Sequence, residues 1–312
     1  MERNSSPQLA NRAFEHHQRR RMRGMGILEF RAGALGVIRF HIPARLLYLS
    51  AHMTRYLKIL RLFWSSSMQG ELEYRLNFIM SALTAIANFA GALFTLHLMF
   101  AGTKTIQGWD WPQALIVTGM FTMMEGLSGV LLSPNLSRIV QYVQKGTLDF
   151  VLLKPIHAQF WLSLRNISPW GIPSLLFGAG LLIYGSIHAG VDPLRMALGV
   201  VPLALGMVIL YSIWFVIGTT TIWFTKIYNA TEVLRAVTDS SKYPMAYYPI
   251  KLQFVFYCIL PVAFLTTVPA EIMLAKSAPF WIAIEAALAA ALFLGASWFW
   301  RFALRSYTSA SS

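Results

Sequence analysis

The stretch MALGVVPLALGMVILYSIWFVIGTTTIWFT, residues 196–225, decides the fold, because it contains no charged side chain from one end to the other. A helix needs about 20 apolar residues to cross the hydrocarbon core of a bilayer, and long apolar runs satisfy their backbone in lipid by forming helices. Hydrophobic residues make up 56% of the 312 residues and charged residues 12%, whereas soluble domains carry about 25% charged residues. The sequence therefore predicts an all-α, polytopic membrane protein.

Five further apolar segments bring the predicted number of crossings to six. They are residues 76–101, 111–132, 166–191, 252–270 and 277–300. Pro261 lies inside the fifth crossing in chain order, where it removes one backbone hydrogen bond. We therefore expect a kink or a broken helix at Pro261.

The basic residues predict the orientation of these crossings. Of the 26 Lys and Arg residues, all except Lys104, Arg195 and Lys276 fall on one side of the membrane. Because basic loops are retained in the cytoplasm, this asymmetry places both termini and the loops 133–165 and 226–251 inside. The net charge of +13 is then explained by loops that face anionic lipid, and no nucleic-acid partner is expected.

The chain is predicted to consist of a basic extension (1–52), a membrane domain (53–305) and a short tail (306–312). The extension carries an arginine cluster at residues 19–23 and little apolar periodicity, so we expect it to be poorly ordered; a true start at Met53 is an open alternative. Residues 54–64 have a narrow basic face. This face favours an interfacial helix on the cytoplasmic leaflet, and the alternative is the beginning of a longer helix.

The loop between the second and third crossings contains a predicted amphipathic helix, residues 133–146. Ser133 is a suitable N-cap and Pro134 suits the first turn. Apolar residues then recur at i, i+3, i+4 and i+7, and Gly146 is a typical C-terminal stop with positive φ. This helix is too short to span, so one face is expected to rest on the membrane helices and the other to meet a soluble partner.

The residues after this helix resemble a known family. The stretches KGTLD (145–149) and LLKPI (152–156) are similar to the inner loop of permease subunits of type-2 ATP-binding-cassette exporters, in a six-helix branch of that family. LPVAF (260–264), VPAE (268–271) and EYRLNF (73–78) also fit this branch. The resemblance covers about residues 53–305.

The resemblance implies a transport subunit without cofactors of its own in the cytoplasmic (inner) membrane. It implies two ATPase partners that bind ATP and Mg, and a second permease copy or paralogue in a homo- or heterodimer. It identifies the loop helix as a coupling helix, whose candidate ATPase-coupling residues are Leu136, Arg138, Ile139, Gln141, Tyr142, Lys145, Gly146 and Asp149. It also implies a re-entrant outer segment around Pro261 and Pro269.

The sequence contains no phosphate-binding loop of the GxxxxGK[ST] type. The nearest string, residues 102–105, lacks the first glycine at the required spacing and lies on the predicted outer side. The chain is therefore not expected to be an enzyme, and ATP hydrolysis is expected on a partner chain.

Two acidic residues lie within the crossings, where a charge is costly. Glu125, in the second crossing, is either a residue of the transport pathway or a hydrogen-bonded carboxyl at a helix contact. Glu285, in the last crossing, has the same two interpretations, and the structural one is favoured for both. Ala283, Ala287, Ala291 and Gly295 form a small-residue stripe suited to close packing within the subunit or across a dimer, and Ala87, Gly91 and Thr95 form a lesser one.

The histidines have no metal-ligand spacing, so no metal site is predicted. A lipid-modifying membrane enzyme and a non-catalytic assembly factor are the alternatives to a transport subunit. The sequence does not identify the transported substrate.

Overall fold

The structure is a computed structural model that describes residues 29–30, 38–39, 44–72, 75–224 and 228–307. The chain divides into two compact units, Met1–Leu62 and Phe63–Ser312. In the first, β1 (Glu29–Phe30) pairs antiparallel with β2 (Ile38–Arg39). Most of residues 1–52 lie outside the described residues, so the predicted disorder of this extension stays a prediction.

The predicted interfacial helix, residues 54–64, belongs to a much longer helix. This helix, α2 (Ala44–Leu72), continues into the second unit. In that unit Trp64 donates its indole N–H to the carbonyl of Leu164 at 3.2 Å, and the Ser67 hydroxyl donates to that of Ile167 at 2.8 Å. The position of α2 relative to a membrane stays a prediction.

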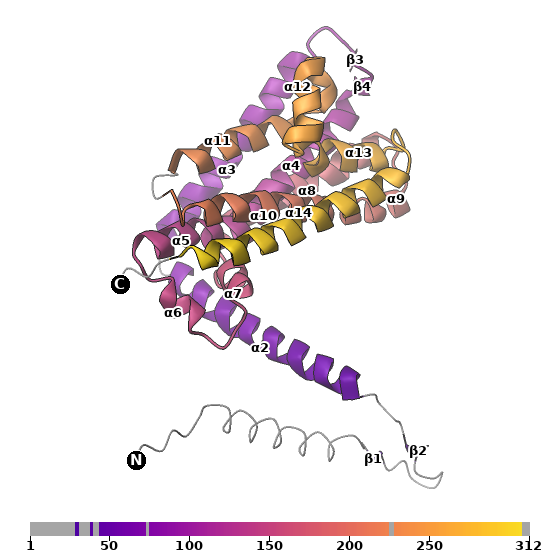
Figure 1. Cartoon of the computed structure of the whole chain (residues 1–312). Coiled ribbons are helices and arrows are strands. Elements are labelled where there is room, and N and C mark those ends of the chain that lie inside the picture. The colour runs from indigo at the N-terminus through magenta and orange to yellow at the C-terminus, as the bar shows by residue number, and fades with distance from the viewer. Residues whose placement is uncertain (1–28, 31–37, 40–43, 73–74, 225–227, 308–312) are drawn as a thin grey trace, which may run out of the picture. The chain divides into compact units, whose positions relative to one another are not determined.

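The second unit is almost entirely helical (Figure 1). Its strands β3 (Thr105–Ile106) and β4 (Trp109–Asp110) form one short hairpin. Its helices are α3 (Arg75–Met99), α4 (Trp111–Leu127), α5 (Ser133–Gln144), α6 (Asp149–Leu152), α7 (Ala158–Leu164), α8 (Ile172–His188), α9 (Pro193–Leu198), α10 (Val200–Thr220), α11 (Tyr228–Asp239), α12 (Ile250–Phe254), α13 (Thr267–Met273) and α14 (Phe280–Arg305).

In the described part of the chain, five helical stretches are long and apolar enough to cross a membrane. They are Leu76–Met99, Trp111–Gln144, Pro169–His188, Pro193–Thr220 and Phe280–Arg305. They agree with five of the six predicted crossings and make the chain a multi-pass membrane protein. The count of six is not confirmed, because the remaining segment, 252–270, does not form one long helix.

The interruption in this segment lies where Pro261 predicts it. The helix that begins at Ile250 ends at Ile259, and Leu260 is extended with φ −116° and ψ 95°. A 3₁₀ turn (Val262–Leu265) and then α13 follow. Every residue from Pro261 to Ala270 is buried, so the broken backbone is covered by protein. The predicted break at Pro261 is therefore confirmed.

The second crossing does not stop where the cap signal at Ser133 predicts. Residues Trp111–Gln144 form one uninterrupted helix, and the Ser133 side chain makes no capping hydrogen bond. A π-helical turn, Ser128–Leu132, joins α4 to α5. Pro134 has no N–H to donate and its ring crowds the preceding turn, and the wider turn accommodates both effects. The predicted α-helix is present from Ser133 to Gln144, and Gly146 follows its end with φ +64°. It continues the second crossing, however, so a separate coupling helix is not confirmed.

The carbonyl groups near this turn find partners elsewhere. The oxygen of Val130 accepts a hydrogen bond from the Ser168 N–H at 3.0 Å, and that of Leu131 accepts one from Asn135 Nδ2 at 2.7 Å. Asn135 Nδ2 also donates to the carbonyl of Asn166 at 2.7 Å, and the Asn166 N–H donates to Asn135 Oδ1 at 2.8 Å. The Asn135–Asn166 pair thus fastens α5 to the segment that leads into α8.

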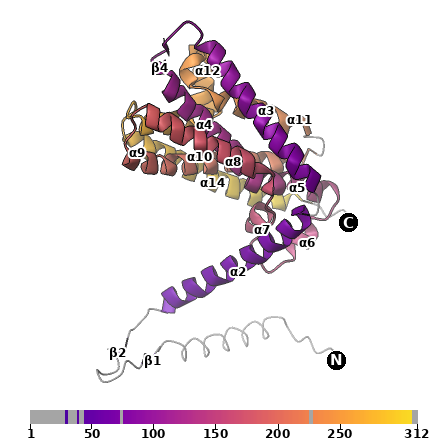
Figure 2. The ribbon, with the colours of Figure 1, turned by 180° about the vertical axis from the view of Figure 1, so that it is seen from behind.

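The helix pair with the closest packing in the unit is α4 with α8, which lie side by side (Figure 2). Glycines on the facing sides of both helices allow this close approach. Gly119 and Gly126 lie on α4; Gly171, Gly178 and Gly185 lie at the start of α8 or along it. A Cβ on Gly178 would lie 2.3 Å from the backbone nitrogen of Met123, and one on Gly126 would lie 2.4 Å from that of Leu175. Both helices therefore touch backbone to backbone.

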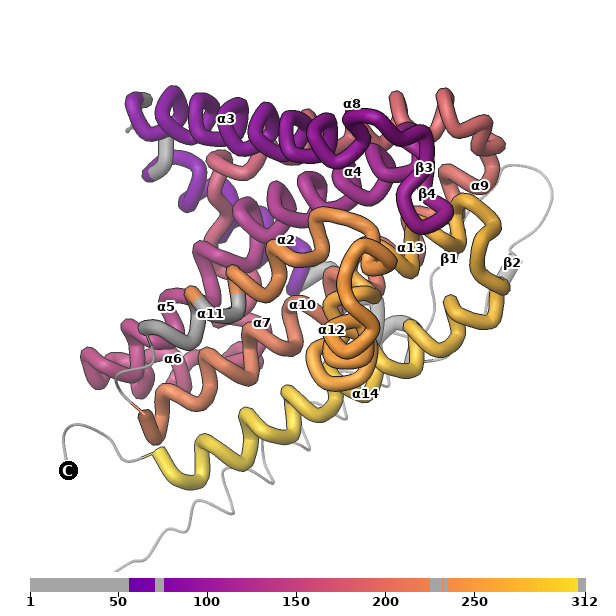
Figure 3. Tube along the Cα trace, turned by 90° about the horizontal axis from the view of Figure 1, so that it is seen from above, coloured from indigo at the N-terminus to yellow at the C-terminus, as the bar shows by residue number. Residues whose placement is uncertain are grey.

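Around this pair, α10 packs along α14, with the rings of Phe215 and Trp300 5.6 Å apart. Figure 3 shows α3 and α14 on opposite sides, with α4 and α10 between them. The predicted small-residue stripe of α14, residues 283, 287, 291 and 295, is exposed throughout, and a Cβ on Gly295 would meet nothing within 4 Å. The stripe therefore does not serve packing among the described residues of this chain.

Gly178→Val is expected to prevent stable assembly of the unit, because the added side chain must overlap the α4 backbone. Gly180→Val is the matched control: it lies two residues along the same helix, with nothing within 4 Å of its Cβ position. The measurement is the yield of monodisperse protein in mild detergent and its thermal unfolding midpoint. Equal behaviour of the two variants would contradict the close α4–α8 contact.

Candidate functional site

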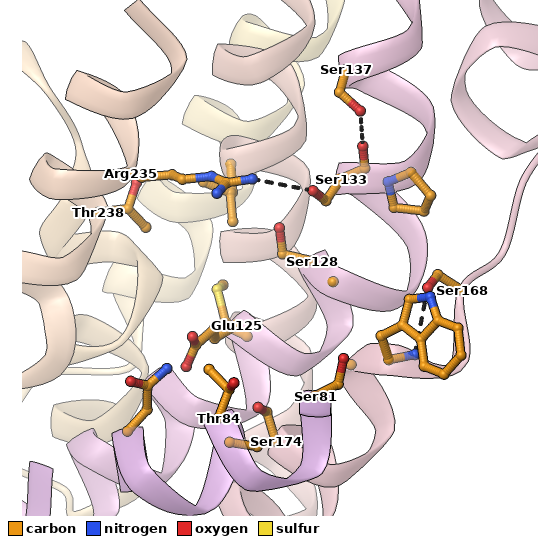
Figure 4. A pocket seen from close by; sticks show the side chains of 18 of the residues that line it. Ser81, Thr84, Glu125, Ser128, Ser133, Ser137, Ser168, Ser174, Arg235 and Thr238 are labelled. Atoms are coloured by element: carbon orange, nitrogen blue, oxygen red, sulfur yellow. Dashed lines mark hydrogen bonds between the residues drawn. The ribbon is translucent and has the colours of Figure 1, made fainter. Parts of the chain in front are cut away.

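A pocket of about 900 Å³ lies among α3, α4, α5, α8, α10 and α11 (Figure 4). Hydroxyl and amide side chains contribute much of its lining, although the helices around it are mostly apolar. Because lipid tails cannot bond such groups, a polar wall between membrane helices is suited to water or to a polar ligand.

The α3 wall carries four of these polar residues on one face. Asn77, Ser81, Thr84 and Asn88 are spaced i, i+4, i+7 and i+11, which places them on one stripe of a helix. Exposed apolar residues such as Leu76, Ile79 and Leu83 occupy other positions of α3. The sequence analysis missed this stripe, since single polar residues in a long apolar run do not stand out until their period is counted.

Glu125 enters the pocket from α4, in the region of Thr84, Ser128 and Ser174 (Figure 4). Its carboxylate has no hydrogen-bond partner among the described residues, and the helix that carries it is apolar. The nearest described cation that influences it, Lys242, lies over the face of the Phe121 ring with its Nζ 5.2 Å from the ring centre. Of the two interpretations of Glu125, this exposed position on the pocket wall favours a role in the pathway.

The two arginines that line the pocket lie toward its α5 end and bond to other residues of the chain. Arg138 Nη1 donates to Asn166 Oδ1 at 3.0 Å. Arg235 Nη2 donates to the Ser133 hydroxyl at 3.4 Å, and its guanidinium lies 5.7 Å from the centre of the Trp214 ring. The charges of these two arginines are thus engaged at the α5 end of the pocket.

Glu285 has a different environment. It is fully buried on α14, and neither carboxylate oxygen has a hydrogen-bond partner among the described residues. It does not line the pocket. Its burial outside the pocket separates it from Glu125, and the hydrogen bonds of the structural interpretation are not present among the described residues.

The predicted ATPase-coupling residues, on α5 and just after it, fall into three groups. Leu136 and Ile139 are buried, so a soluble partner cannot reach them in this conformation. Arg138 and Gln141 line the pocket, and Lys145 is exposed. Tyr142, Gly146 and Asp149 are partly buried and lead toward α6.

The apolar surface that a partner can reach lies further along, on α6 and its C-terminal end. Phe150 is 68% exposed and Leu153 81%, and Leu152 lies between them. Leu148 and Val151 are buried in the core and anchor the same short helix. The sequence analysis used this stretch only as a mark of resemblance. Its apolar residues are divided between the core and the surface, and the sequence does not show which of them are exposed.

The Trp161 side chain is the common contact of the residues around the α5–α7 loop. The Nζ of Lys154 lies 4.8 Å from the centre of its ring and the guanidinium carbon of Arg165 5.2 Å from it. The rings of Tyr142 and Phe63 approach it at 5.9 and 6.2 Å. Residues of α2, α5 and α7 and of the α6–α7 connection therefore meet at one indole, so the loop is held as a unit.

The string at residues 102–105 does not form a phosphate-binding loop. It leads into the β3–β4 hairpin, whose turn residues Gln107 and Gly108 have φ values of +48° and +79°. Lys276 Nζ donates to the Gly108 carbonyl at 2.7 Å and lies 4.1 Å from the centre of the Trp109 ring. Burial lowers the pKa of Lys276, and Asp110 and Glu271 oppose this shift. Among the described residues no group of three or more His, Cys, Asp or Glu side chains could hold a metal ion.

A multi-pass helical protein with a polar pocket between its helices and a protruding loop is the architecture of a membrane transport subunit. A sequence profile of the family described as ABC-2 family transporter protein matches residues 86–311. The match covers most of the chain, so this protein belongs to the ABC-2 transporter family and is a permease subunit of an ABC transporter. No curated protein matches the chain significantly.

Proposed function

We propose that this permease is the membrane part of an ATP-driven exporter in the cytoplasmic membrane. Its expected partners are two ATP-hydrolysing subunits, which bind ATP and Mg, and a second permease copy or paralogue. Its termini and the α5–α7 loop lie in the cytoplasm, as the distribution of basic residues favours. The pocket that contains Glu125 holds the cargo.

The observation that carries this proposal is the continuity of the helix Trp111–Gln144. Its first part supplies Glu125 to the pocket, and its last part leads through Gly146 to α6. Motion imposed on the loop is therefore transmitted along one rigid helix to the pocket wall. Closure of the ATPases would bias the permease between two arrangements of this wall.

The orientation can be tested with single cysteines, after the lone Cys258 is replaced by Ser. In that background, Thr103→Cys is expected to react with a membrane-impermeant maleimide in intact cells. Leu153→Cys is expected to react only after permeabilisation, since α6 belongs to the basic inner loop. Labelling of Leu153→Cys alone in intact cells would contradict the proposed orientation.

The exposed side chains Phe150, Leu152 and Leu153, here called the α6 tip, form the proposed ATPase docking surface. Apolar residues gathered on an exposed loop are typical of a protein interface. Lys145 and Lys154 flank them and limit their insertion into the lipid core. Burial of one Leu or Phe side chain contributes about 1.5–3 kcal/mol, so the tip is sufficient to anchor a partner.

The double variant Phe150→Asp/Leu153→Asp is expected to lower co-purification of the ATPase about tenfold or more, because it replaces apolar contacts by charges. The control is Leu194→Asp, a similarly exposed leucine on α9 in the predicted outer loop. The readout is the ratio of ATPase to permease in membranes solubilised in mild detergent. A ratio unchanged from that of the control would remove the α6 tip as the docking surface.

A further inference from the structure

We infer that the pocket selects amphiphilic ligands that carry an amine in its cationic ammonium form, with Glu125 as the counter-charge. This inference rests on the proposed function for the statement that the ligand is cargo. It names the substrate class, which neither the fold nor the family identifies.

Glu125 supplies the first argument, because its carboxylate faces the pocket without a partner. A charged side chain in a membrane helix costs about 2.5–3.5 kcal/mol by insertion scales. Such a carboxylate usually has a partner that compensates this cost, and among the described residues Glu125 makes neither a hydrogen bond nor an ion pair. A ligand ammonium group is the partner that restores charge balance and donates hydrogen bonds at the same time.

The charges around Glu125 supply the second argument, because each cation of the pocket is already in contact with another residue. Lys242 lies against Phe121, and Arg235 lies against Trp214. Arg138 is bonded to Asn166. The charge of Lys242 does act on Glu125, but that of Asp239 acts in the opposite sense. Two carboxylates against one lysine leave the Glu125 part of the pocket with a net negative charge. An anionic head group would meet Glu125 there and Asp239 on the α11 wall.

The rest of the lining completes the description of the ligand. Asn77, Ser81 and Asn88 have no hydrogen-bond partner among the described residues, and their oxygens can accept bonds from an ammonium group or its neighbours. Apolar side chains, among them Met124 and Leu265, line other parts of the pocket. A cationic head with an apolar body satisfies both parts.

The test uses the full-length permease in nanodiscs of zwitterionic lipid, without ATPase. Three dansyl probes share one alkyl linker and end in an ammonium, a hydroxyl or a sulfonate group. Binding is measured by fluorescence anisotropy. The wild-type protein is expected to bind the ammonium probe about tenfold or more tightly than the other two, because a charge-assisted bond is stronger than a neutral one.

Four variants then locate the preference. Glu125→Gln is expected to abolish it by weakening only the ammonium probe, and Glu125→Asp to retain it. Asn88→Asp adds a carboxylate to the α3 wall and is expected to tighten the ammonium probe further. Glu285→Gln is the control, since this buried residue lies outside the pocket.

The inference is overturned if Glu125→Gln leaves the preference intact, or if the hydroxyl or sulfonate probe binds wild type as tightly as the ammonium probe. Tight binding of the sulfonate probe would indicate that the arginines at the α5 end bind the charged group instead of Glu125. If Glu125→Gln does not yield folded protein, the test rests on Asn88→Asp, which is expected to bind the ammonium probe more tightly than wild type. Unchanged affinity of this variant for the ammonium probe would count against the inference. Because no ATPase is present, the absence of an ammonium preference would not affect the proposed docking of the ATPase at the α6 tip. Equally, a negative co-purification result would not affect the probe-binding result.

Discussion

The contact on which the other elements depend is the backbone approach of α4 to α8. Lipid tails are as apolar as leucine side chains, so membrane helices gain little from burying apolar groups and associate largely through close packing. Gly119 and Gly126 on α4 meet Leu182 and Leu175 of α8 at distances that no side chain would permit. The glycines recur every seven residues on both helices, which keeps them on the facing stripes over the length of the contact. The α4–α8 pair is therefore closely packed along its length, and residues of both helices form one wall of the pocket.

The chain departs from regular α-helical geometry at the end of the α4–α8 contact that contains Gly126 and Gly171. Near Gly171 the π-helical turn Ser128–Leu132 passes the chain around Pro134, and Ser168 and Asn135 bond the nearby carbonyls. Arg138 joins the same network through Asn166. The proline would have ended the helix without these bonds. With them, the helix runs without a gap from the pocket wall to the loop, as the proposed coupling to an ATPase requires.

Much of the fold could be predicted from the sequence, because lipid leaves the backbone few choices. Five of the crossings, the break at Pro261 and the positive φ of Gly146 all follow from residue type and position. Ser133 and Pro134 mark the start of α5, but this local signal does not show that a π-helical turn joins α5 to α4. The glycines of α4 and α8 could not be told from the stripe ending at Gly295, since both are small residues at helical spacing. Only the packing shows which of them meets another helix.

The two intramembrane acids show the same limit at the candidate site. Glu125 and Glu285 are each a single carboxyl in an apolar helix, and by sequence they carry the same two interpretations. Packing separates them: Glu285 is fully buried on α14, whereas Glu125 faces a pocket lined by hydroxyl and amide groups. An enclosed carboxyl can interact only with the groups that surround it, whereas one that faces a pocket can also interact with a ligand. The polar stripe of α3 lines the same pocket as Glu125 and not the surroundings of Glu285. It places neutral hydrogen-bonding groups around the Glu125 carboxylate, which makes no direct ion pair with the described protein. The chemistry of the pocket is therefore set by Glu125, and its shape by the glycine contact that holds α4 in place.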